Sequence, residues 1–104
     1  MIDKTKWFNY SFYQQMGNIA SELSRAIIFE NRNNDDHKRA SLLRLIELLD
    51  LTKEDPKNKK RLKELCRFKE VVADWYSGQK TYHVHPESLK SYAMQFAILA
   101  AKRK

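Results

Sequence analysis

The sequence has few of the residues that break helices or close tight turns. Only two glycines and two prolines occur among its 104 residues. All-β folds need many turns, and glycine and proline are the residues that mark most turns. Their scarcity therefore predicts an all-α protein built from long helices. At this length the chain is expected to form a single domain, residues 1–104.

Long apolar runs and paired cysteines are also missing. No apolar run approaches the roughly 18 residues that a membrane span needs, and residues 1–7 contain no apolar signal core. Cys66 is the single cysteine, so no internal disulfide can form, which agrees with a reducing compartment. These absences predict a cytoplasmic protein that does not insert into a membrane.

No catalytic or metal-binding motif in the sequence rises above what chance would give. His83 and His85 flank Val84, but no cysteine, third histidine or paired acid lies near them in the sequence to complete a metal site. Cys66 falls on an apolar stripe, which favours a small core residue over a nucleophile. We therefore expect no cofactor, no metal and no enzymatic activity.

Apolar residues recur with helical spacing in four segments. The first segment shows this well, because its apolar positions are separated by four and three residues in turn: Phe12, Met16, Ile19, Leu23 and Ala26. The predicted helices cover about residues 11–31, 36–53, 56–77 and 86–102. Because short connections join them, the sequence predicts an antiparallel up-down four-helix bundle.

Capping residues support these helix ends. Ser11 and Gln14 fit a capping box, in which each side chain bonds the backbone amide of the other residue. Asn34 or Asp35 can cap the second helix through a side-chain oxygen. Gly78 is suited to the left-handed conformation that often ends a helix, so it predicts the end of the third one.

Positive charge is in excess. The chain has 20 lysines and arginines against 13 acidic residues, a net charge of +7. Such an excess favours anionic polymers as partners, above all RNA or DNA. A protein whose charge serves only its solubility is the alternative, and charge alone does not decide between the two.

The start of the third predicted helix concentrates this charge. Cations at a helix N-terminus oppose the helix dipole, so helix stability does not explain them there, whereas phosphate binding would. Lys59, Lys63 and Arg67 are spaced four apart and are expected to share one helix face. We predict backbone contacts to nucleic acid, chiefly RNA, from this run and from the C-terminus: Lys57, Lys59, Lys60, Arg61, Lys63, Arg67, Lys102, Arg103 and Lys104.

Two groups of apolar residues exceed what one bundle seam needs. Trp7, Phe8 and Tyr10 form an aromatic lead-in that either caps the core or docks on a partner. The second predicted helix, with Leu45 and Leu48, is apolar nearly all round, so it is central or lies against another subunit. We predict a homo-oligomer or partner interface from these five residues, with core packing as the alternative.

Residues 32–37 resemble the R-x4–6-H signature of HEPN-type ribonucleases through Arg32 and His37. In that family the arginine and histidine help to cleave RNA, and the domain is helical and usually dimeric. The resemblance implies a ribonuclease or toxin as an alternative function. Here, however, the segment falls on a predicted turn, whereas the family places it at a helix.

In architecture, size and charge, the whole chain also resembles the small bundle proteins encoded in large-subunit rRNA intervening sequences. The related accessory variability determinants of diversity-generating retroelements share these features. The resemblance implies ring-shaped pentamers with a basic surface. For the retroelement members it further implies binding to a reverse transcriptase and to nucleic acid, without enzymatic activity. A pure protein–protein interaction module remains a further alternative.

Overall fold

Helices form all the regular structure in residues 3–78 and 86–102, which the computed structural model describes. In chain order they are α1 (Lys4–Asn9), α2 (Phe12–Asn31), α3 (Asp35–Glu54), the 3₁₀ helix η1 (Pro56–Arg61), α4 (Leu62–Ser77) and α5 (Pro86–Lys102). The short helix α1, with Asp3 as its N-cap, lies in the aromatic lead-in. The four predicted helices correspond to α2, α3, η1 with α4, and α5.

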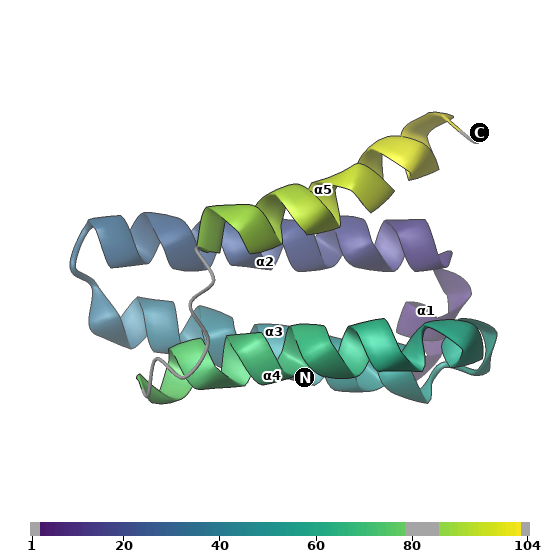
Figure 1. The fold of residues 1–104 in the computed structure, drawn as a ribbon, viewed down its shortest axis with the longest axis horizontal. Helices are drawn as coiled ribbons and strands as arrows, with labels where there is room; N and C mark the ends of the chain where they lie inside the picture. Colours follow the sequence, from purple (N-terminus) through teal and green to yellow (C-terminus); the bar gives the residue numbers. More distant parts are fainter. Residues whose placement is uncertain (1–2, 79–85, 103–104) are drawn as a thin grey trace.

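The four long helices alternate in direction, as predicted for an up-down bundle (Figure 1). α2 packs against both α3 and α5, α3 packs against α4, and α1 lies against α3. Towards its C-terminal end α5 leans away from α2 (Figure 1). No helix in the described residues is both long and apolar enough to cross a membrane.

The predicted caps are confirmed. Ser11 Oγ accepts from the Gln14 amide at 3.1 Å, and Gln14 Oε1 accepts from the Ser11 amide at 2.9 Å, which completes the capping box of α2. Asn34 caps α3, since its Oδ1 accepts from the His37 amide at 3.2 Å. Gly78 ends α4 with a φ of +76°, the left-handed conformation that suits glycine.

The third predicted helix needs a correction, because residues 56–61 are wound as a 3₁₀ helix and not as α-helix. A 3₁₀ helix has three residues per turn and an α-helix has 3.6, so the predicted spacing of four holds only from Leu62 onwards. Lys63 and Arg67 share a face of α4. Lys59 lies in η1, so the expectation that all three cations share one α-helical face is wrong.

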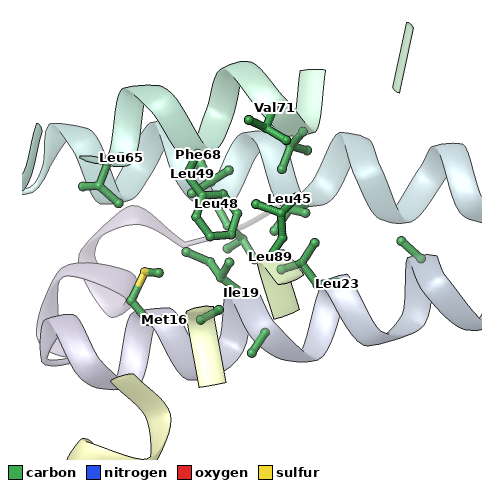
Figure 2. Packing of buried hydrophobic residues seen from close by; sticks show 14 of the residues in the cluster. Met16, Ile19, Leu23, Leu45, Leu48, Leu49, Leu65, Phe68, Val71 and Leu89 are labelled. Carbon is green, nitrogen blue, oxygen red and sulfur yellow. The ribbon is translucent and has the colours of Figure 1, made fainter. Parts of the chain in front are cut away.

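Figure 2 shows that the core is built from apolar side chains of all four long helices. The labelled residues are Met16, Ile19, Leu23, Leu45, Leu48, Leu49, Leu65, Phe68, Val71 and Leu89. Burying a leucine or phenylalanine side chain contributes about 1.5–3 kcal/mol. α3 has apolar residues on more than one face because it contacts α1, α2, η1 and α4.

The predicted oligomer interface needs a correction for the same reason. Leu45 is 0% and Leu48 is 5% exposed, so both are core residues with almost no surface left for a partner. Trp7 is also buried in the core, and Phe8 and Tyr10 are half-buried against it. The core-packing alternative is therefore the one that fits these residues.

Candidate nucleic-acid interface

Four exposed cations lie along η1 and the first half of α4. Lys59, Lys60, Lys63 and Arg67 are all exposed, and none of them forms an ion pair with another described residue. We call these four side chains the basic surface. An unpaired cation keeps its full charge for a ligand, so this surface can attract phosphate groups.

Two cations of the predicted cluster serve the fold instead. Lys57 Nζ donates to the Phe8 carbonyl oxygen at 2.8 Å and pairs with the Asp55 carboxylate. The Arg61 guanidinium lies over the Phe12 ring, 4.3 Å from its centroid, in a cation–π contact. Lys102 ends α5, but its side chain, like Arg103 and Lys104, lies outside the described part of the chain. The prediction for these three C-terminal cations stays open.

Elsewhere on the surface, several cations have acidic neighbours. The distances are 3.3 Å for Lys4–Glu54, 3.6 Å for Lys38–Glu30 and 2.6 Å for Lys69–Asp50. Such exposed pairs add little to stability, but each cancels a positive charge locally. The basic surface is therefore a place where the excess charge of the chain remains uncancelled.

A buried polar network fixes the position of η1. Gln15, Asp55 and Asn58 are each at most 3% exposed. Gln15 Nε2 donates to Asp55 Oδ2 at 2.9 Å and to the Trp7 carbonyl oxygen at 3.0 Å. Asn58 Nδ2 donates to Gln15 Oε1 and to the Thr52 carbonyl oxygen, both at 2.9 Å. We call these five residues the Gln15 network; it ties α1, α2, α3 and η1 together.

The Gln15 network also bears on the pKa of Asp55. Burial raises the pKa of this carboxyl, but hydrogen bonds from Lys57 and Gln15, together with the Lys57 charge, hold it below its ordinary value on balance. The folded protein therefore binds the proton less readily than the unfolded chain does. The ionised Asp55 therefore contributes its full stabilisation at a pH above the ordinary Asp pKa of about 3.9. This contribution is lost as the pH falls below that value.

We expect an Asp55→Asn variant to be less stable than the wild type at neutral pH, because it lacks the charge that Lys57 pairs with. The difference should shrink as the pH falls below about 4, where the wild type loses the same interaction. Urea unfolding at a series of pH values measures both. Asp36→Asn, at an exposed position in the first turn of α3, is the control. A difference that is constant with pH would contradict this assignment.

The two residues behind the ribonuclease alternative lie on either side of the α2–α3 turn. Arg32 is exposed at the C-cap of α2, and His37 lies in the first turn of α3. The His37 Nδ1 atom is 2.9 Å from Asn34 Oδ1, and its ring packs against Phe29 at a centroid distance of 5.0 Å. Among the described residues no hydrogen bond joins Arg32 to His37.

A metal site is not found in the part of the chain that the structure covers. Within residues 3–78 and 86–102, no group of three or more histidine, cysteine, aspartate or glutamate side chains could hold an ion. His83 and His85 lie outside these ranges. Cys66, which the sequence favours as a small core residue, is a free and half-buried thiol.

Comparisons with known proteins found no matching family model, curated protein or solved structure. The two resemblances noted from the sequence therefore remain expectations.

Proposed function

We propose that the protein is a non-enzymatic accessory protein that binds the backbone of nucleic acid, chiefly RNA, through its basic surface. The observation that carries this proposal is the run of exposed cations Lys59, Lys60, Lys63 and Arg67, which lack ion pairs with the described residues. Lysine and arginine contacts to phosphates supply most of the affinity of sequence-independent binding. Such contacts position a polymer but do not read its bases.

Assembly with other chains is a second part of the proposal. Met94 and Ile98 are 41% and 50% exposed and lie four residues apart on one face of α5. Apolar side chains at this spacing suit a helix-to-helix contact. They support a homo-oligomer. We further propose, from the resemblance to the bundle proteins, a cytoplasmic protein that also binds a protein partner such as a reverse transcriptase.

Backbone binding predicts a strong dependence of affinity on salt. The logarithm of the association constant should fall with the logarithm of salt concentration by about 0.9 for each duplex phosphate neutralised. Replacing Lys59, Lys63 and Arg67 together with glutamine should reduce that slope by about three units if each makes one contact. Fluorescence anisotropy with a labelled duplex RNA over a range of salt concentrations measures the slope.

The matched control removes the same charge at the other end of the bundle. Arg32, Arg39 and Lys90 lie at or near the α2–α3 turn and the start of α5, away from η1 (Figure 1). Replacing these three with glutamine should leave the slope nearly unchanged. Equal effects of the two triple variants would mean that net charge alone drives binding. RNA cleavage by the wild type but not by His37→Ala would instead favour the ribonuclease alternative.

A further inference from the structure

A small, mostly apolar hollow lies beside the basic surface, between α4 and α5. Its volume is about 250 Å³, and its walls are Glu64, Arg67, Phe68, Val71, Leu89 and Tyr92. Arg67 also lines a second hollow with Lys63, Cys66 and Glu70. A polymer whose phosphates contact Lys63 and Arg67 would therefore lie next to the apolar hollow.

The walls of this hollow suit a flat aromatic ring. Phe68 of α4 and Tyr92 of α5 are in contact at a tilted angle, with ring centroids 5.9 Å apart, and Val71 and Leu89 add aliphatic surface. Drug-sized ligands occupy pockets of about 300–1,000 Å³. At about 250 Å³ this hollow is smaller than that range and is matched to a single ring system.

Polar groups occur at the edge of the hollow. The Tyr92 hydroxyl donates to Glu64 Oε2 at 2.8 Å. Burial, the hydrogen bond to Glu64 and the Glu64 charge raise the pKa of Tyr92 to about 12, so its hydroxyl stays protonated at neutral pH. The exposed Glu64 carboxylate has further lone pairs, which can accept from the amino hydrogens of a nucleobase.

We propose that this hollow receives one unpaired nucleobase of a single strand whose phosphates lie on the basic surface. The inference rests on the proposed function and adds the class of nucleic acid to it. In a duplex the bases are stacked and paired, so only a single strand, a loop or a bulge can place a base here. Stacking on aromatic side chains tolerates every base, while Glu64 favours bases that carry amino groups.

The test compares two labelled single strands of about 12 nucleotides: an ordinary strand and an abasic strand, which has the same sugars and phosphates but no bases. Both strands have the same phosphates, so the basic surface binds both. The wild type should bind the strand with bases about 5- to 100-fold more tightly, as expected from the stacking of one base. Tyr92→Leu should abolish most of this preference, whereas Tyr92→Phe, which keeps the ring, should retain it.

The salt slope separates this proposal from the proposed function. Tyr92→Leu should leave the slope unchanged. Replacing Lys59, Lys60 and Lys63 with glutamine keeps every wall of the hollow, so this variant should retain the preference for bases while its slope falls. Equal binding of the two strands by the wild type would overturn the hollow as a base site even if backbone binding holds. A change in oligomeric state with Tyr92→Leu, at an unchanged preference, would assign the hollow to a second copy of the chain. Absence of binding to any strand would overturn both proposals.

Discussion

Replacing Gln15 with methionine is expected to lower the free energy of unfolding by about 2–4 kcal/mol. Methionine keeps the unbranched shape of the side chain but offers no comparable hydrogen bonds. The Trp7 carbonyl oxygen, Asp55 Oδ2 and Asn58 Nδ2 would each lose a partner in a buried site. A buried polar group left without its partner costs about 1–3 kcal/mol.

The expected loss of stability is smaller than the sum for three unsatisfied groups, because each of these partners keeps another hydrogen bond. The Trp7 carbonyl oxygen also accepts from the Tyr10 amide at 3.2 Å, Asp55 keeps Lys57, and Asn58 keeps the Thr52 carbonyl oxygen. For a domain of this size, 2–4 kcal/mol corresponds to a fall in Tm of roughly 10–25 °C. Thermal melts of the wild type and of Gln15→Met measure this fall in Tm. Gln95→Met, at an exposed position on α5, is the control. Equal melting of the two variants would contradict a structural role for the Gln15 network.

The Gln15 network could not be read from the residue types, because glutamine and asparagine usually face water. The spacing of Gln15 from apolar residues of α2 did indicate that it is buried. Gln15 is three residues after Phe12 and four before Ile19, so it shares the buried face of α2 with them. No comparable signal marks Asn58, whose burial depends on Gln15 and Thr52 from two other helices. Such long-range partners are fixed only when the helices have packed.

The helix ends were predictable for the opposite reason. A capping box depends on residues three apart, so Ser11 and Gln14 carry their own information wherever α2 packs. The conformation of residues 56–61 is not local in this sense. Gln15 forms hydrogen bonds with Asp55 and Asn58, at the start of the segment. This segment is a 3₁₀ helix, whereas the sequence predicted an α-helix. The candidate site shares this dependence, since Lys59 and Lys60 lie in that 3₁₀ helix.

Charge identified the right segment for the candidate site but not the role of each cation. Lys57 and Arg61 have the same sequence surroundings as Lys59 and Lys60. Lys57 nevertheless contacts the Phe8 carbonyl oxygen and Arg61 the Phe12 ring. Both partners come from the N-terminal part of the chain, 49 residues before the cation in each case. Only the folded arrangement distinguishes cations that stabilise the bundle from cations that remain available to a ligand.

Leu45→Ala is expected to destabilise the protein by about 2–5 kcal/mol, whereas Leu43→Ala should change stability by about 0.5 kcal/mol or less. The two leucines lie two residues apart on α3, but Leu45 is 0% and Leu43 is 46% exposed. Truncating the buried side chain leaves a cavity between α2, α3 and α4, while truncating the exposed one only increases helix propensity slightly. Urea unfolding of both variants measures the difference.

Protein concentration distinguishes a core leucine from an interface leucine. Stability that comes from association rises with protein concentration, because the folded assembly is favoured by mass action. A core residue acts within one chain, so the loss caused by Leu45→Ala should be the same at every concentration. A loss of stability that appears only at concentrations where the wild type is assembled would show that Leu45 lies in an oligomer interface, as the sequence pattern predicted. Because Leu45 has no exposed surface in the bundle, we expect the constant loss.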